Sequence, residues 1–271
     1  MICILISLLT VLLSFALQAG FVVTENGVPK AEIIVSETPE KPIAAAAEEL
    51  QLWIREISGA ELPILARPEK LPQRIILHAG VVANDAFAAE IAQLKDTNGY
   101  AIRQKDSDLY LIGATPKGVL NSVYKLLFDN TDIIWARPNV EFGTLFTQKP
   151  SLDFTKTDCI DIPKFKMLGW QFPYGTQKNE LLWSVRNRSN WTNMSWSSNP
   201  LNDTYGMFEE AYFGHNINGI YIKGSKYYKD HPEFFPLING RRVDPSSRRH
   251  LTQLCFTNKE MIAAFIKDFD H

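Results

Sequence analysis

The chain has 271 residues, of which 45% are hydrophobic and 21% are charged, and its formal net charge is −2. This composition is typical of a globular protein and excludes a largely disordered chain. The basic residues are scattered and form no arm or block, so the sequence does not support binding of DNA or RNA.

The N-terminal stretch ICILISLLTVLLSFAL is uncharged, and the small residues Ala19 and Gly20 follow it. It is shorter than the roughly 20 apolar residues that a membrane-spanning helix needs. We interpret residues 1–19 as a secretory signal peptide, although no basic residue precedes the apolar run; an uncleaved anchor is the alternative. No cysteine follows the run in position for lipid attachment, so we expect a secreted or periplasmic protein without stable membrane association after cleavage.

Residues 20–155 have the pattern of an α+β domain. One helix is predicted to begin at Pro42 and to end before Gly59, with apolar residues at helical spacing on one face. A second helix is predicted from Thr115 onward, with Pro116 at its first position. Strands are predicted at 31–36, 62–65, 74–80, 100–105, 108–114 and 132–138. We expect a mixed sheet with both helices on one face.

The phrases AAAEELQLWIREISGAELPI, GYAIRQKDSDLYLIGATPKGVLNSVYKLLF and IIWARP follow one another in this part of the chain. In this order they resemble the N-terminal domain of family 67 α-glucuronidases, which is also seen as the second, non-catalytic domain of β-hexosaminidases. The resemblance implies an accessory domain that precedes a catalytic barrel and supplies no catalytic residue.

A polar stretch, 141–158, is predicted to link this domain to a second unit at 156–271. The second unit alternates predicted strands and helices, as the start of a (β/α) barrel does, but a barrel needs about 250 residues to close. We therefore expect the first βα units of an incomplete (β/α)8 TIM-like barrel, in a fragment of a longer protein. The predicted elements are a strand at 165–172, a helix at 180–191, an extended run after FGHN, a hairpin at Asn239-Gly240, a strand at 252–256 and a helix capped by Thr257 and Glu260.

The second unit contains RNR, FGHN, YYKDHPEFFPLINGRR and QLCFTNKEM. These phrases resemble the beginning of the domain of unknown function 4838, which occurs in exported bacterial proteins behind the same kind of N-terminal domain. The resemblance implies a glycoside-hydrolase-like character and carbohydrate as the partner.

Glycoside hydrolysis needs two carboxyl groups, which barrel enzymes place at the ends of their strands. Related barrels place the acid after the fourth strand or later, so we expect the catalytic pair beyond His271. Asp230 and Glu233 are the best carboxylates of the second unit, and a solvated helical turn is their alternative interpretation.

Four other residues are candidates for binding substrate. Arg186 has the forked donors that hold a carboxylate or sugar hydroxyls, or else pairs with a local acid. His215 and Asn216 follow Gly214 in a predicted loop, where they contact substrate or form an exposed turn. Trp170 stacks on a sugar ring or belongs to the core.

The histidines show neither an HxH nor an HExxH pattern, and no glycine-rich phosphate loop occurs, so no metal and no cofactor is expected. After signal cleavage only Cys159 and Cys255 remain, and the sequence leaves open whether they pair.

The sequence thus predicts an exported, glycoside-hydrolase-like protein, related to α-glucuronidases, for the breakdown of polysaccharides or glycosides. The 271-residue chain itself is expected to be inactive because it lacks the catalytic carboxylates. The alternative is a non-catalytic carbohydrate-binding or surface-assembly protein.

Overall fold

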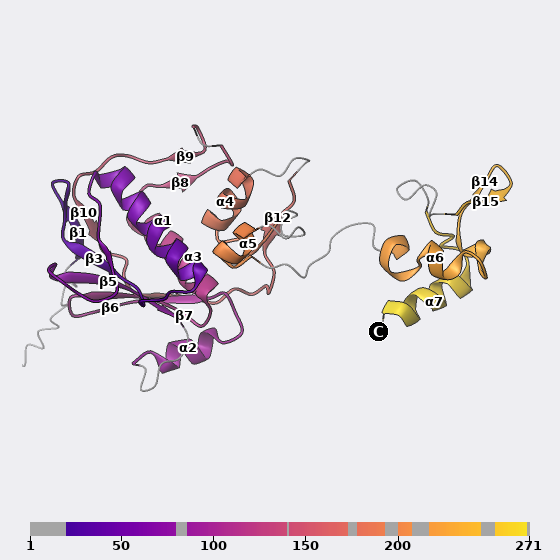
Figure 1. Ribbon diagram of the computed structural model, residues 1–271, viewed down its shortest axis with the longest axis horizontal. Helices are drawn as coiled ribbons and strands as arrows, with labels where there is room; N and C mark the ends of the chain where they lie inside the picture. Colours follow the sequence, from indigo (N-terminus) through magenta and orange to yellow (C-terminus); the bar gives the residue numbers. More distant parts are fainter. Residues whose placement is uncertain are drawn as a thin grey trace, which may run out of the picture. The chain divides into compact units, whose positions relative to one another are not determined.

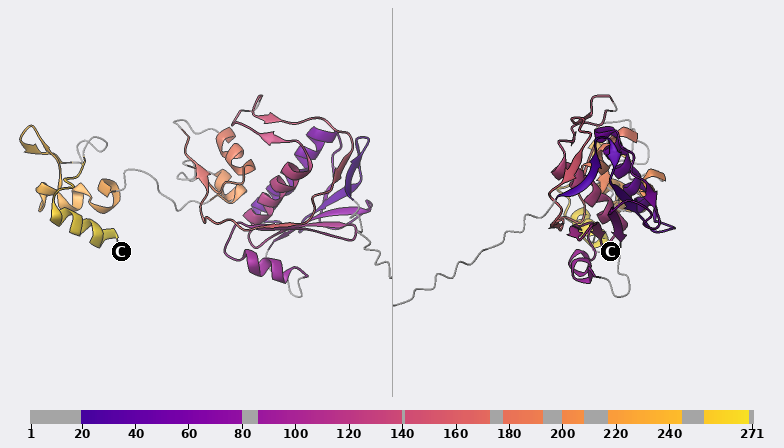
Figure 2. Two further views of the ribbon diagram at one scale, coloured as in Figure 1. Left: turned by 180° about the vertical axis from the view of Figure 1, so that it is seen from behind. Right: turned by 90° about the vertical axis from the view of Figure 1, so that its left-hand side faces the viewer.

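The structure is a computed structural model that describes residues 20–79, 86–139, 141–172, 178–192, 200–207, 217–244 and 253–269. The chain divides into two compact units, Met1–Glu209 and Glu210–His271 (Figures 1 and 2). From here on these are called the first and the second unit, so the second unit is shorter than the predicted one at 156–271. The predicted signal peptide lies outside the described residues. The described residues contain no helix that is both long and apolar enough to cross a membrane.

The first unit is built on a mixed six-stranded sheet with the order β11-β6-β7-β5-β3-β4. Strands β4, β3, β5 and β7 are parallel neighbours, whereas β6 pairs antiparallel with β7, and β11 with β6. The strands are β3 (Ala31–Ile34), β4 (Ile64–Leu65), β5 (Gln73–Ala79), β6 (Tyr100–Lys105), β7 (Asp108–Gly113) and β11 (Cys159–Asp161). The predicted mixed sheet and its β6–β7 hairpin are confirmed.

Helices α1 (Lys41–Ser58) and α3 (Pro116–Asn130) cover one face of this sheet, as predicted (Figure 1). The apolar face of α1 is buried, and Gly59 ends the helix in a left-handed conformation at φ 77°. Thr115 caps α3, because its hydroxyl accepts a hydrogen bond from the backbone N–H of Gly118 at 3.1 Å.

A third helix, α2 (Ala88–Leu94), covers the opposite face of the sheet, so the expectation of helices on one face alone is incomplete (Figures 1 and 2). Its residues Ile91 and Leu94, with Phe87, pack on Ala101 and Ile112 in a separate apolar cluster. A helix of seven residues makes fewer than two turns, which is too short to show a clear helical repeat in the sequence.

The first unit also contains two small sheets. Strand β1 (Phe21–Glu25) lies between β2 (Val28–Pro29) and β10 (Leu152–Phe154), and β8 (Ile134–Trp135) pairs with β9 (Thr144–Leu145). The stretch 141–158, expected to be a link, therefore contributes two paired strands. With β11 in the main sheet, the boundary suggested after Thr155 lies inside the first unit.

The rest of the first unit contains one strand–helix–strand segment and a further helix. Strands β12 (Gly169–Trp170) and β13 (Trp191–Thr192) are parallel, and α4 (Lys178–Arg186) lies between them in the chain. Helices α4 and α5 (Pro200–Tyr205) pack against α3 and α1, respectively. The described strands form no closed barrel.

The second unit surrounds a small core of Ile222, Phe234, Phe235, Leu254 and Met261. The predicted hairpin is confirmed, with positive φ at both Asn239 and Gly240. The elements are a π-helix at Ile217–Tyr221 (η1), α6 (Gly224–Tyr227), a 3-10 turn at Pro232–Phe234 (η2), β14 (Leu237–Ile238), β15 (Arg241–Arg242) and α7 (Lys259–Phe269).

Three details of the second unit differ from the prediction. The run after FGHN is the π-helix η1 rather than an extended segment, and residues 253–256 form no strand. Helix α7 is capped by Asn258, whose side-chain oxygen accepts from the backbone N–H groups of Glu260 and Met261. Asparagine satisfies these donors as well as threonine does, so the cap lies one residue later than Thr257.

Candidate functional site

A cavity of about 480 Å³ opens in the first unit between α1, α4 and the β8–β9 hairpin. Four aromatic side chains line it: Trp53, Trp135, Phe146 and Trp183. Polar side chains from the same elements complete the lining, and they are Glu56, Arg137, Asn139, Glu141, Thr144, Lys178, Asn179 and Arg186. The cavity therefore combines apolar rings with hydrogen-bonding groups of both charges.

The aromatic rings hold one another in place. Trp53 lies edge-on to Trp135 at 5.8 Å between ring centroids and to Phe146 at 6.1 Å. The indole N–H of Trp183 donates to the backbone oxygen of Trp135 at 2.9 Å. Trp53 and Trp135 are buried, whereas Phe146 and Trp183 are half-buried and present ring surface to the cavity.

Trp135 also has an unsatisfied donor. Its indole nitrogen is buried and has no hydrogen-bond acceptor among the residues that the structure describes. A buried N–H without an acceptor costs free energy on the order of 1–3 kcal/mol.

Arg186 lies at the edge of the cavity and is bound to Glu49 of α1. Its Nε and one terminal nitrogen donate to the two carboxylate oxygens, both at 2.9 Å, and the guanidinium lies 4.9 Å from the ring centre of Trp53. Burial disfavours the charged form of Arg186, but the hydrogen bonds and charge of Glu49 outweigh it and raise the pKa. Of the two sequence interpretations, pairing with an acid is the one observed, although Glu49 is distant in sequence.

Trp170 is half-exposed, at 51% of its surface, and its ring lies edge-on to Trp183 at 5.2 Å. Because Trp183 and Arg186 both line the cavity, the structure brings the predicted residues Trp170 and Arg186 to the same region. The predicted residues His215 and Asn216 lie outside the described residues.

The two candidate carboxylates lie in the second unit. Asp230 is exposed in a turn. A hydrogen bond of 3.1 Å joins Oε1 of Glu233 to Nδ1 of His231. The backbone N–H of Glu233 itself, followed by His231, holds the pKa of Glu233 below the usual range. A carboxyl group that donates a proton to a leaving group needs a raised pKa instead, so this environment does not suit Glu233 as a general acid.

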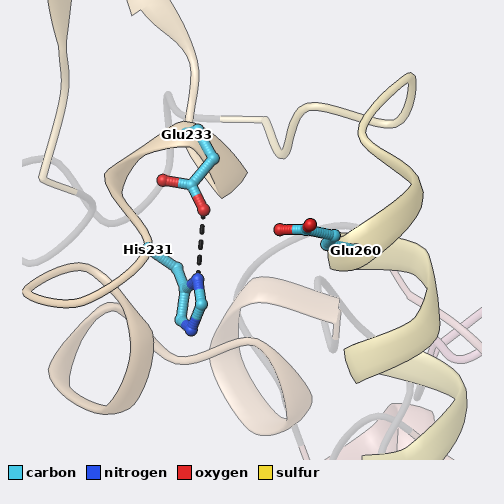
Figure 3. A group of neighbouring side chains, drawn as sticks. All are labelled: His231, Glu233 and Glu260. Carbon is cyan, nitrogen blue, oxygen red and sulfur yellow. Dashed lines mark hydrogen bonds and ion pairs between the residues drawn. The ribbon is translucent and has the colours of Figure 1, made fainter.

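The same part of the second unit gathers a set of possible metal ligands. His231, Glu233 and Glu260 each offer one ligand atom, and these atoms lie within 4.8 Å of one another (Figure 3). This group is not evident from the sequence, because Glu260 is far from the other two residues in the chain and the spacing matches no metal motif.

Apart from Arg186, the residues of the cavity lining are not evident as a site from the sequence. Trp53 and Trp135 are the two tryptophans that precede the aromatic-rich second half of the chain, and each was interpreted only as part of its helix or strand. Their concentration with Trp183 is a property of the fold. Cys159 and Cys255 are both free thiols.

Residues 147–271 match the family model described as "Domain of unknown function (DUF4838)". No curated protein matches the chain.

Among solved structures, the chain is similar to a family GH115 4-O-methyl-α-glucuronidase with specificity for decorated arabinogalactans. The TM-score is 0.52 and the identity 14%, over 78% of this chain and 33% of that enzyme. It also matches a GH138 enzyme that targets the pectin rhamnogalacturonan II, at 16% identity and TM-score 0.30, over 43% of this chain and 15% of that one.

A third match is a β-hexosaminidase of Streptomyces plicatus, at 14% identity and TM-score 0.32, over 56% of this chain and 25% of that one. The chain thus spans a third or less of each of these enzymes. The likeness to the GH115 structure shows a glycoside-hydrolase-like fold.

Proposed function

We propose that this chain belongs to an exported glycoside-hydrolase-like protein and binds carbohydrate in the aromatic cavity of its first unit. The observation that carries the proposal is the lining of that cavity. Half-buried rings of Phe146 and Trp183 offer flat apolar surfaces, and polar groups surround them. Sugar rings have the same two-sided chemistry, because their C–H faces are apolar and their hydroxyls form hydrogen bonds.

The basic groups of the lining suit a sugar that carries an acid, although Glu56 and Glu141 also line the cavity. Arg137 and Lys178 line the cavity, and Arg186 keeps one terminal nitrogen free of partners among the described residues. The GH115 relative in fold is specific for decorated arabinogalactans. We therefore propose uronate-bearing oligosaccharides of plant polysaccharides as the ligand class.

We propose that the 271-residue chain binds sugar without cleaving it. Glu49 is the buried carboxylate beside the cavity, and both of its oxygens already accept hydrogen bonds from Arg186. Glu56 and Glu141 are exposed, whereas a general acid lies in an apolar pocket that favours its protonated form. Hydrolysis of aryl glycosides or xylan-derived uronides by the purified chain would contradict this part of the proposal.

The binding site is tested by calorimetry with glucuronate-decorated arabinogalactan oligosaccharides and their undecorated counterparts. We expect the decorated ligands to bind and Trp183→Ala to weaken binding at least tenfold. Phe128 is an exposed aromatic residue of α3 outside the cavity lining, so Phe128→Ala is the matched control and should leave affinity unchanged.

Two results would refute binding in this cavity. One is the absence of binding to any acidic or neutral glycan by the wild-type chain. The other is an equal loss in the Trp183 and Phe128 variants when both remain folded by circular dichroism.

Export is tested separately from binding. We propose cleavage after residue 19, so the protein recovered from the periplasm or medium should begin at Gly20 by mass spectrometry. A cell-associated protein that retains Met1 would support the uncleaved anchor.

The parallel β12–α4–β13 segment is proposed as the first βα unit of a TIM-like barrel.

A further inference from the structure

Three side chains of the second unit point toward a common space in Figure 3. His231 and Glu233 come from the η2 turn and the residue before it, and Glu260 comes from the first turn of α7. We propose that His231 Nδ1 and the carboxylates of Glu233 and Glu260 bind a divalent transition-metal ion, and that Zn²⁺ is the ion this ligand set favours. Imidazole nitrogen and carboxylate oxygen are both Zn²⁺ ligands.

The distances fit such an ion. Zn²⁺ holds nitrogen and oxygen ligands at about 2.0–2.2 Å in a tetrahedron, so neighbouring ligand atoms lie roughly 3.3 Å apart. His231 Nδ1 and Glu233 Oε1 are already 3.1 Å apart. The ligand atom of Glu260 lies within 4.8 Å of both, a gap that rotation of its exposed side chain closes. Water would occupy the fourth position.

The surroundings hold two of the three ligands in position. The imidazole of His231 stacks on Phe234, with 4.7 Å between centroids and 15° between planes, and Phe234 is 2% exposed. Asn258 caps α7 at the backbone of Glu260, and the neighbouring Met261 is buried in the core. Metal sites depend on such supporting contacts to orient their ligands.

The charges of the group favour a bound cation. Two carboxylates within 4.8 Å repel each other when both are ionised. Among the described residues, no lysine or arginine forms an ion pair with Glu233 or Glu260. The charge of Arg242 reaches Glu233, but its guanidinium donates to the backbone oxygen of Phe235 instead. A divalent ion between the carboxylates would replace this repulsion by attraction.

A metal here would connect the η2 turn to α7. The core of the second unit contains only a few buried apolar side chains among the described residues, and small cores gain stability from a metal. Because a preformed set of ligands exists in the folded state alone, binding would stabilise that state.

The test is calorimetric titration of the full chain with ZnCl₂ after treatment with EDTA. We expect one Zn²⁺ per chain at micromolar or tighter affinity, and a melting temperature that rises with Zn²⁺ and falls again with EDTA. His231→Ala and Glu260→Gln should each weaken binding at least tenfold. Glu260→Gln keeps the size of an exposed side chain, so it tests the site without disturbing the fold.

Two variants serve as controls. Asp230→Asn removes an adjacent carboxylate outside the group, and Cys255→Ser removes a nearby thiol that also has affinity for Zn²⁺. Both should bind as the wild type does. The proposal is overturned if the wild-type chain binds no Zn²⁺, if Glu260→Gln binds as tightly as Asp230→Asn, or if Cys255→Ser alone abolishes binding.

Discussion

Arg186 and Glu49 are 137 residues apart in the sequence and form a two-pronged ion pair between α4 and α1, with both hydrogen bonds at 2.9 Å. Trp53 donates a further hydrogen bond to the same carboxylate at 3.0 Å. The side chains are 18% and 8% exposed, so water screens the pair little. The pair ties the segment after β11 to the first helix of the unit and forms one edge of the aromatic cavity.

Removal of one partner should be costly. Arg186→Met leaves the Glu49 carboxylate buried without its charged partner, so we expect a loss of about 3–5 kcal/mol in the free energy of unfolding. Urea denaturation followed by tryptophan fluorescence measures this loss. The double variant Arg186→Met, Glu49→Met removes both charges and should recover most of it.

The pair Lys41–Asp203 is the matched control. It also joins α1 to a later helix, α5, but both side chains are 66% exposed. Lys41→Met should therefore change the free energy of unfolding by less than about 1 kcal/mol. Equal effects of the Lys41 and Arg186 substitutions would show that burial does not strengthen the Glu49 pair.

Lys117 should destabilise the protein in a pH-dependent manner. It is 3% exposed, its amine has no described hydrogen-bond partner, and burial lowers its pKa from 10.5 to about 7. Between these values the unfolded chain binds the proton more tightly, so stability should rise with pH through this window. The cost of burying the charge is fully present below pH 7.

Lys117→Met should therefore raise the free energy of unfolding by about 2–5 kcal/mol at pH 6 and by much less at pH 10. Urea titrations at the two pH values make the comparison. A wild-type stability that does not rise between pH 7 and 10, relative to the variant, would contradict a charged lysine buried at this position.

Glu32 should contribute stability that is lost at acid pH. Burial disfavours its ionised form, but backbone N–H groups of Leu71, Lys70 and Glu69 donate to the carboxylate at 2.7–3.0 Å and lower its pKa below 4.5. The stabilisation is complete above pH 4.5 and is lost as the pH falls through the lower folded-state value.

Glu32→Gln should cost about 1–3 kcal/mol at pH 7, because a neutral amide is a weaker acceptor and one donor loses its partner. Thermal unfolding between pH 3 and 6 compares the two proteins. The melting temperature of the wild type should fall more steeply below pH 4.5 than that of the variant, and parallel curves would exclude this role for Glu32.

Gly118 should not tolerate a side chain. A Cβ atom there would lie 2.3 Å from the backbone oxygen of Gly99, where α3 meets the start of β6. Alanine normally improves a helix by about 1 kcal/mol over glycine. Here the clash is with a backbone atom, which cannot move aside by a change of rotamer. We therefore expect Gly118→Ala to lower the free energy of unfolding by about 1–3 kcal/mol. A gain in stability in urea denaturation would show that α3 can shift away from β6.

The sequence predicts best what neighbouring residues decide. Pro42 and Gly59 bound α1 closely, and Asn239-Gly240 specifies its hairpin, since each signal acts within a turn or two of the chain. The pairing of β11 with β6 has no such local signal. Strand pairing depends on which edges remain free after the rest of the sheet has formed, and a single sequence does not record that.

The candidate site shows the same limit. Arg186 was recognisable as a forked donor, but its partner Glu49 looked like an ordinary charge in a helix. The aromatic content signalled a role for tryptophan without revealing that Trp53 and Trp183 share one cavity. Likewise, Glu260 joins His231 only because α7 packs beside the η2 turn.

The pairing of Phe21 in β1 with Phe154 in β10 has a consequence for how the protein is made. Thr24 and its hydrogen-bond partner Pro150 are 126 residues apart. At about 5–20 residues per second, a ribosome needs roughly 6–25 seconds to translate that interval. Throughout this time the edge of β1 that later pairs with β10 remains open, and this is when a chaperone would find it most accessible.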